Sequence, residues 1–209
     1  MKLILLGVSG AGKGTQAKKL SKYYEIPHIS TGDIFREHMR DKTEIGLAIH
    51  DIMDKGGLVE DELTIKLVKE RIKQDDCKNG YILDGFPRTL YQAESLEDFA
   101  IIDKAIYVKV DDKVVIERLT GRLVCPKCSA MYHVKNFPPK VSGKCDVCDT
   151  SLVQREDDKA ETVSDRLDIF HKLTSPIINF YEEKDKLFTV DGTKDVFATK
   201  ELIVEILGV

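Results

Sequence analysis

At residues 7–15 the chain reads Gly7-Val8-Ser9-Gly10-Ala11-Gly12-Lys13-Gly14-Thr15, and this stretch decides the fold. The apolar run at residues 3–6 predicts a short buried strand before it, and a helical pattern begins after it. A glycine-rich turn from strand to helix is the setting of a phosphate-binding loop, because backbone N–H groups and the positive helix terminus then face an anion. Since the spacing G-x-x-x-x-G-K is complete, we favour a phosphate site with Lys13 as its mobile cation over a turn that binds nothing.

The rest of the chain alternates short apolar runs with helical patterns. Strands are expected at 27–30, 81–84, 105–110 and 187–190, and helices at 13–24, 31–39, 46–55, 61–74, 89–99, 112–119, 160–186 and 196–207. Asp61 is expected to cap its helix, and Pro176 to kink or break the long one. Strands alternating with helices predict an α/β fold with a doubly wound parallel sheet, whose ligands bind beyond the carboxyl ends of the strands.

The composition argues against two classes of protein. The chain carries 32 Lys and Arg residues against 36 Asp and Glu residues, a net charge of −4, whereas a dedicated nucleic-acid binder is usually basic. No apolar run approaches the roughly 18 residues of a membrane span, and the chain runs from Lys2 directly into an expected core strand without a signal peptide. We therefore expect a cytoplasmic protein with no membrane or nucleic-acid partner.

Polar residues follow the strand expected at 81–84. Asp84 ends this strand at the sheet edge that carries the phosphate loop, where P-loop proteins place an acidic residue for Mg²⁺, usually through water. The alternative is a helix-capping Asp, and the phosphate loop in the same sheet favours the metal. Arg88 offers a planar fork for a phosphate. The amide of Gln92 can donate and accept hydrogen bonds at once, although by itself Gln92 would be a solvated helix residue.

The character of the sequence changes at Arg122. From there to Asp158 the chain is rich in Cys, Pro, Gly and Lys and shows no helical period. Four of the five cysteines form two C-x-x-C pairs separated by sixteen residues: Cys125, Cys128, Cys145 and Cys148. This spacing is typical of a zinc site, and four thiolates around Zn²⁺ leave no open coordination position. We therefore predict a small module with a structural zinc ion, and a structural or surface role for the lone Cys77.

Three stretches resemble the adenylate kinase family of nucleoside monophosphate kinases. They are the Gly-Lys-Gly-Thr form of the phosphate loop, Asp84-Gly85-Phe86-Pro87-Arg88-Thr89, and Thr31-Gly32-Asp33-Ile34-Phe35-Arg36. The cysteine module is similar to the zinc-bearing lid of one bacterial branch. The resemblance implies a monomer with a five-stranded P-loop core domain (1–29, 60–121 and 159–209), an AMP-binding domain (30–59) and a zinc-binding lid (122–158). It also implies reversible phosphoryl transfer from Mg-ATP to AMP, giving two ADP, with closure over both nucleotides.

The resemblance also assigns residues to each substrate. The residues implied for ATP are Gly10, Ala11, Gly12, Lys13, Gly14, Thr15, Arg118, Arg122, Met131, Tyr132 and Lys194. The residues implied for AMP are Thr31, Arg36, Gly57, Leu58, Val59, Gly85, Arg88, Gln92, Arg155 and Arg166. Catalytic roles are implied for Lys13, Asp84, Arg88, Arg122, Arg155 and Arg166.

Some of these assignments have simpler alternatives. Leu58 and Val59 also fit an ordinary core. Arg118 and Arg122 lie four residues apart at an expected helix end, so we expect them on one helix face with an anion between them. Arg40 and Arg71 match no phosphate position, and we expect them in surface ion pairs.

Two other functions stay open at this point. One is phosphorylation of CMP, UMP or GMP, although Thr31 and Gln92 favour AMP. The other is nucleic-acid binding by the cysteine module as a zinc ribbon, because that segment places lysines beside Tyr132 and Phe137. The acidic net charge and the phosphate loop argue against the second function.

Overall fold

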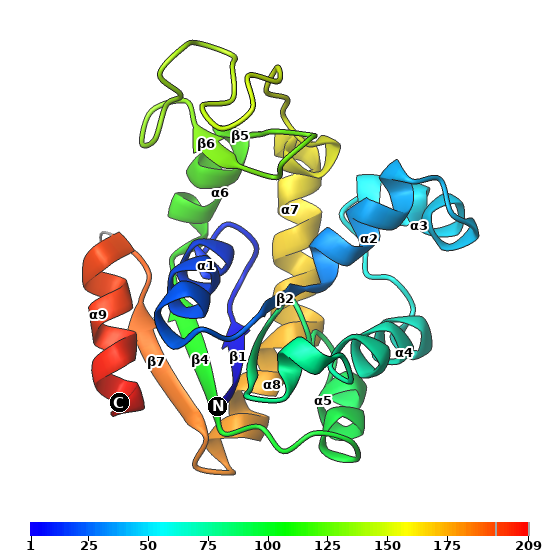
Figure 1. The fold of residues 1–209 in the computed structure, drawn as a ribbon, viewed down its shortest axis with the longest axis vertical. Helices are drawn as coiled ribbons and strands as arrows, with labels where there is room; N and C mark the ends of the chain where they lie inside the picture. The colour runs from blue at the N-terminus through cyan, green and yellow to red at the C-terminus, as the bar shows by residue number, and fades with distance from the viewer. Residues whose placement is uncertain (195, 209) are drawn as a thin grey trace.

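The core of the protein is a five-stranded parallel sheet (Figure 1). The computed structural model describes residues 1–194 and 196–208. The strands follow the order β2-β3-β1-β4-β7, and all neighbours pair in parallel. Their bounds are Lys2–Leu6 (β1), His28–Ser30 (β2), Tyr81–Asp84 (β3), Lys104–Lys109 (β4) and Leu187–Asp191 (β7). The predicted α/β fold is confirmed, and the loops after β1 and β3 leave the same edge of the sheet.

The helices lie where the periodicity predicts them, with small shifts at their ends. Their bounds are Lys13–Tyr24 (α1), Thr31–Arg40 (α2), Glu44–Asp54 (α3), Asp61–Arg71 (α4), Leu90–Glu97 (α5), Asp112–Thr120 (α6), Ala160–Ile169 (α7), Ser175–Glu182 (α8) and Val196–Leu207 (α9), with 3₁₀ turns at Asp75–Cys77 and Glu156–Asp158. Glu60 rather than Asp61 occupies the cap position of α4, so the predicted capping role of Asp61 is wrong. In the described part of the chain, no helix is both long and apolar enough to cross a membrane.

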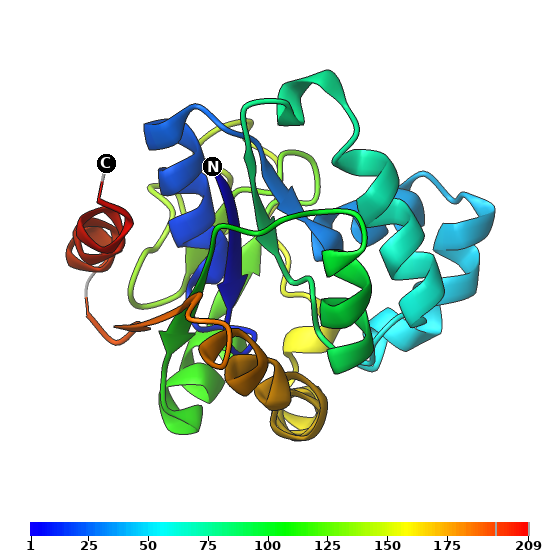
Figure 2. The same cartoon turned by 90° about the horizontal axis from the view of Figure 1, so that it is seen from below.

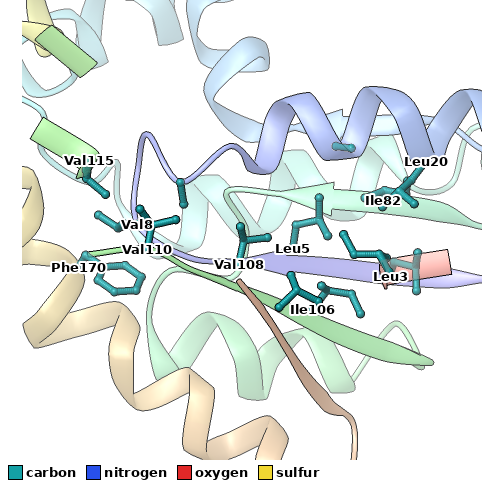
Figure 3. Close-up of a cluster of buried hydrophobic side chains, with 14 of the residues drawn as sticks. Leu3, Leu5, Val8, Leu20, Ile82, Ile106, Val108, Val110, Val115 and Phe170 are labelled. Atoms are coloured by element: carbon teal, nitrogen blue, oxygen red, sulfur yellow. The ribbon is translucent and has the colours of Figure 1, made fainter. Parts of the chain in front are cut away.

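Successive residues of β1 pack on opposite faces of the sheet, because side chains alternate along a strand. Leu3 and Leu5 belong to a buried cluster under α1 and α9, part of which Figure 3 shows. Ile4 and Leu6 belong to a second buried cluster, under α5 and α8. Figure 2 shows these two pairs of helices on opposite sides of the sheet. The continuous apolar run before the phosphate loop is therefore explained by burial on both faces.

The helix predicted at 160–186 is interrupted, but before Pro176 rather than at it. Between α7 and α8, Phe170–Thr174 form a π-helical turn. Pro176 lies in the first turn of α8, where a missing N–H is tolerated. The buried Thr174 donates from its hydroxyl to the backbone oxygen of Arg88 at 2.9 Å. The interruption therefore ties this helix to the loop that follows β3.

Residues 122–158 form an insertion that lies above α6 and α7 at the top of Figure 1, and we call it the four-cysteine insertion. It contains the antiparallel pair β5 (Arg122–Val124) and β6 (Met131–His133). Its buried cluster consists of Cys125, Tyr132 and Cys145. The missing helical period of the sequence matches this loop-rich structure.

Candidate active site

One cleft at the carboxyl ends of the strands collects the predicted nucleotide residues. Its volume is about 970 Å³, a size typical of small-molecule sites. Its lining includes every residue that the resemblance assigns to ATP, AMP or catalysis: Gly10, Ala11, Gly12, Lys13, Gly14, Thr15, Thr31, Arg36, Gly57, Leu58, Val59, Asp84, Gly85, Arg88, Gln92, Arg118, Arg122, Met131, Tyr132, Arg155, Arg166 and Lys194. Their individual roles stay predictions.

The phosphate loop joins β1 to α1 through a backbone that its glycines allow. Gly12 caps α1 with a φ of +99°, in a region that side chains disfavour. The Nζ atom of Lys13 donates to the backbone oxygens of Gly7 at 2.7 Å and of Val8 at 3.0 Å. Burial lowers the pKa of Lys13 to about 8, because desolvation disfavours the ammonium form. A bound phosphate would compensate for the lost water.

Asp84 ends β3 beside the phosphate loop and has a partner that the sequence did not indicate. The Nε2 atom of His28 lies 3.2 Å from Oδ2 of Asp84, because β2 and β3 are neighbours in the sheet. Burial alone would raise the pKa of Asp84, but the hydrogen bond with His28 and the charge of Lys13 hold this pKa below its usual value. His28 also lines the cleft.

Three arginines bring positive charge into the buried part of the cleft: Arg88, Arg155 and Arg166. The pKa of Arg88 is lowered to about 10, mainly by burial and secondly by the like charge of Arg166. The pKa of Arg155 is lowered to about 9, mainly by burial and secondly by the like charge of Arg36. The buried Nε of Arg155 has no hydrogen-bond partner among the described residues. Buried like charges and an unpaired donor form an arrangement that a bound anion would stabilise.

A carboxylate at the end of the four-cysteine insertion holds two of the cleft's arginines. Asp158 is fully buried and accepts hydrogen bonds from Nε of Arg122 at 2.7 Å and from Nη1 of Arg166 at 3.0 Å. The prediction that Arg118 and Arg122 share a helix face is wrong, because α6 ends before Arg122, which begins β5. Arg118 instead donates to the backbone oxygen of Ala11 at 3.3 Å.

The other side of the cleft is built around the backbone oxygen of Gly85. This oxygen accepts hydrogen bonds from the hydroxyl of Thr31 at 2.8 Å and from Nε of Arg88 at 2.9 Å. Arg36, which was predicted to hold a phosphate, forms an ion pair with Asp33 at 2.6 Å. The loop after β3 and the start of α2 are therefore joined directly at the cleft.

Gln92 is 2% exposed on this side of the cleft, and both ends of its amide are bonded. Its Oε1 accepts from the backbone N–H of Arg88 at 2.7 Å, and its Nε2 donates to Oδ1 of Asp61 at 2.7 Å. One N–H and one lone pair of the amide remain. The sequence assigned Asp61 only to a helix cap and gave no sign of this contact, because its partner lies 31 residues away.

The segment 57–59 lines the cleft, whereas the two arginines without an expected phosphate role lie outside its lining. Val59 is buried in an apolar cluster, as the core interpretation predicts, and it also lines the cleft with Gly57 and Leu58, whose assignment to AMP stays a prediction. Arg40 and Arg71 form ion pairs with nearby acidic residues outside the cleft lining. The predicted surface pairing of these two arginines is confirmed.

The four cysteines of the insertion converge in space. All four sulfur atoms lie within 4.8 Å of one another: Cys125, Cys128, Cys145 and Cys148. Four thiolates grouped this closely suit a single tetrahedral Zn²⁺. The hydroxyl of Tyr132 accepts from the backbone N–H of Asp146 at 2.8 Å and lies 3.5 Å from Sγ of Cys145. Its polar end therefore belongs to the cysteine cluster.

Comparison with known proteins agrees with this geometry. The family model described as adenylate kinase matches residues 5–186. An adenylate kinase of Clostridium perfringens (strain SM101 / Type A) is 52% identical over 213 residues, covering 100% of this chain and 99% of the relative. Adenylate kinases of Clostridium beijerinckii and Clostridium tetani are 52% and 51% identical, with the same coverage. The chain therefore belongs to the adenylate kinase family.

Proposed function

We propose that the chain catalyses reversible phosphoryl transfer from Mg-ATP to AMP, giving two ADP. The observation that carries the proposal is the convergence of Lys13, Arg88, Arg155 and Arg166 in one buried cleft. Such a site suits two polyanionic substrates whose phosphates meet, and it stabilises the charge on a transferring phosphoryl group. Membership in the adenylate kinase family supports the same reaction at the general level.

The nucleophile in this proposal is a phosphate oxygen of AMP. A phosphate monoester has a second pKa of about 6, so it is mostly dianionic at neutral pH and the transfer needs no general base. The protein has to align both phosphates and neutralise their charge. The proposed phosphate ligands are the loop at 10–15 for ATP, Arg36 and Arg88 for AMP, and Arg122, Arg155 and Arg166 for the transferring group.

The bases and sugars would lie at the two ends of the cleft. We assign the ATP end to Arg118, Met131, Tyr132 and Lys194. We assign the AMP end to Thr31, Gly57, Leu58, Val59, Gly85 and Gln92. These assignments rest on the family resemblance together with the shared cleft.

The cleft fits Mg²⁺ as the companion of ATP. Asp84 offers a hard carboxylate oxygen beside the phosphate loop, and its lowered pKa keeps that carboxylate ionised at neutral pH. The ion would supply positive charge that neutralises the phosphates of ATP. Asp84 would hold the hydrated ion, and His28 would hold Asp84 in place.

The cysteine cluster fits Zn²⁺ in a structural role. Four thiolates complete a tetrahedral shell, so no position is left for a substrate. The ion would replace the apolar core that the insertion lacks. We therefore propose that zinc stabilises the fold of the four-cysteine insertion and takes no part in the transfer.

We propose that the four-cysteine insertion (122–158) and residues 30–59 close over the nucleotides, on a core of residues 1–29, 60–121 and 159–209. Both segments contribute to the cleft, Arg122 from one and Arg36 from the other. Closure would exclude the water that otherwise hydrolyses ATP. The net charge of −4 favours free nucleotides over nucleic acid as ligands, and we propose a cytoplasmic monomer.

A coupled assay of ADP formation tests the reaction, with ATP paired in turn with AMP, CMP, UMP and GMP. AMP should be the preferred acceptor. Preference for CMP, UMP or GMP would assign the chain to another monophosphate. No turnover with any of the four would overturn the proposal.

Arg88→Ala tests the division of the cleft into two sides. Because the Arg88 fork is assigned to the monophosphate, its loss should raise KM for AMP more than KM for ATP. Arg71→Ala, outside the cleft lining, is the matched control. Weaker ATP binding with unchanged AMP binding would reverse the assignment.

A further inference from the structure

Asp61 lies in the first turn of α4, just after the cleft-lining segment 57–59, and reaches across to the start of α5. Its Oδ1 accepts a hydrogen bond from Nε2 of Gln92 at 2.7 Å, and its Oδ2 accepts one from the hydroxyl of Thr89 at 2.9 Å. Both oxygens are thus occupied by donors about 30 residues away in the sequence. The side chain caps no helix of its own, so these two contacts are what it does.

The opposite end of the Gln92 amide is held as firmly. Its Oε1 accepts from the backbone N–H of Arg88 at 2.7 Å, and Gln92 is almost fully buried. A backbone N–H can only donate a hydrogen bond, and the carboxylate of Asp61 can only accept one. A flipped amide would therefore place its NH₂ against the N–H of Arg88 and its oxygen against the carboxylate of Asp61.

We infer that Asp61 is a positioning residue that sets the base specificity of the cleft by fixing the orientation of the Gln92 amide. This inference rests on the base-reading role of Gln92 in the proposed function. With the orientation fixed, the amide has one N–H left at the Asp61 end and one lone pair left at the Arg88 end.

The chemistry of purines turns this orientation into specificity. Adenine offers an acceptor at N1 and a donor at its 6-amino group, which match the free N–H and lone pair of Gln92. A 6-oxopurine, such as the base of IMP, offers an N–H at N1 and a carbonyl at position 6, which is the reverse order. In the same pose it would require the flipped amide that Asp61 and the backbone of Arg88 oppose.

The test compares kcat/KM for AMP and for IMP as acceptors from ATP, in the wild-type protein and in Asp61→Asn. The Asn amide has nearly the shape of the carboxylate, but it can either donate or accept, so it no longer opposes a flipped Gln92. The ratio of kcat/KM for AMP to that for IMP should fall by about tenfold or more, the worth of one hydrogen bond to a charged group. The change should lie mainly in KM for the acceptors, while KM for ATP stays within about twofold.

Two further variants separate specificity from stability. Glu62→Gln removes the same charge from the same turn of α4 at an exposed position, and it should leave the ratio unchanged. Asp61→Ser is measured beside Asp61→Asn, so that a folding defect in one variant does not decide the result. A purely structural role would lower the melting temperature and the use of AMP and IMP alike. An unchanged ratio in a folded Asp61 variant would overturn the inference.

Gln92→Ala distinguishes failure of the inference from failure of the proposed function. If Gln92 reads the base, this variant also loses much of the preference for AMP over IMP. An unchanged preference in Gln92→Ala would overturn the base-reading assignment itself. A lost preference in Gln92→Ala together with an intact preference in both Asp61 variants would overturn the role of Asp61 alone.

Discussion

The phosphate loop and the four-cysteine insertion hold their shapes in different ways. The loop follows a strand whose residues Leu3 to Leu6 are at most 3% exposed, so the main core supports it from both faces. The insertion has a small buried cluster, while Phe137, Val141 and Val147 are each more than half exposed. Burial of apolar surface therefore specifies the loop, and four sulfur atoms converging on one point specify the insertion.

This difference has a consequence for mutation. A side chain of the loop that faces the ligand can be removed without loss of the fold, because the core is untouched. A single thiol of the insertion cannot be removed so easily, because each one would supply a quarter of the proposed zinc shell. Function should therefore fail without unfolding in one region, and folding should fail before function in the other.

The largest expected effect is that of Lys13→Met in the phosphate loop. Turnover should fall by about two to four orders of magnitude, as is typical for the loss of preorganised charge stabilisation. The melting temperature should hardly change, because the ammonium is a buried charge whose pKa is already lowered by desolvation. The coupled assay and a thermal melt measure the two quantities.

Lys22→Met, at an exposed position of the same helix, is the control for Lys13→Met. It should keep wild-type turnover. Activity of Lys13→Met within about threefold of wild type would contradict the assignment of the loop to phosphates.

Asp158→Asn tests the boundary between the two regions. The variant leaves the guanidinium groups of Arg122 and Arg166 without their shared buried carboxylate, which should cost about 3 kcal/mol of unfolding free energy. For a chain of this size the melting temperature should fall by about 6–12 °C. Glu156→Gln, an exposed change in the same 3₁₀ turn, is the control, and equal melting temperatures for both variants would refute this role of Asp158.

Cys145→Ser tests the insertion itself. The variant should lose bound zinc, and the insertion should unfold in a separate early transition, while the main transition shifts by only about a few degrees. Catalysis should survive at temperatures where the insertion is still folded. Zinc content measures the loss of the ion, thermal melts measure the early unfolding of the insertion, and low-temperature assays measure the surviving catalysis.

Cys77→Ser is the matched control, because Cys77 is a buried thiol outside the cluster, and this variant should keep its zinc. If Cys145→Ser kept the stability of the insertion and yet lost all turnover, the ion would be catalytic.

The smallest expected effect is a pH dependence of ATP binding through Lys13. In the nucleotide-free protein the pKa of Lys13 is about 8, below its ordinary 10.5, so the side chain loses its charge as the pH rises through about 8. Phosphates bind the charged form, so affinity should be nearly full at pH 7 and fall as the pH rises through about 8. Between pH 7 and pH 9 the loss should be about tenfold, with proton uptake on binding.

Calorimetric titration with ATP at the two pH values, in buffers of different ionisation enthalpy, measures this pH effect. Lys13→Met should show neither the loss of affinity nor the proton uptake. A wild-type affinity that does not change between pH 7 and pH 9 would contradict the role of the Lys13 charge.

Local pattern alone predicted much of the site. The strand, loop and helix at residues 2–24 follow from an apolar run, glycine spacing and a helical period, all of which act between near neighbours in the chain. The spacing of the C-x-x-C pairs likewise predicted the cysteine cluster. Because parallel strands send their carboxyl ends to one edge, Asp84 and the phosphate loop could be placed together before any contact was known.

Only the tertiary structure decided which side chains meet across the sheet and between helices. His28 contacts Asp84 because β2 and β3 pair, and Asp61 holds Gln92 because α4 and α5 pack together. Arg122 lies on a strand that pairs with β6, which its helical spacing from Arg118 could not reveal. Periodicity reports which face of an element is buried, whereas the partner of a buried polar group depends on strand order and helix packing between residues far apart in the sequence.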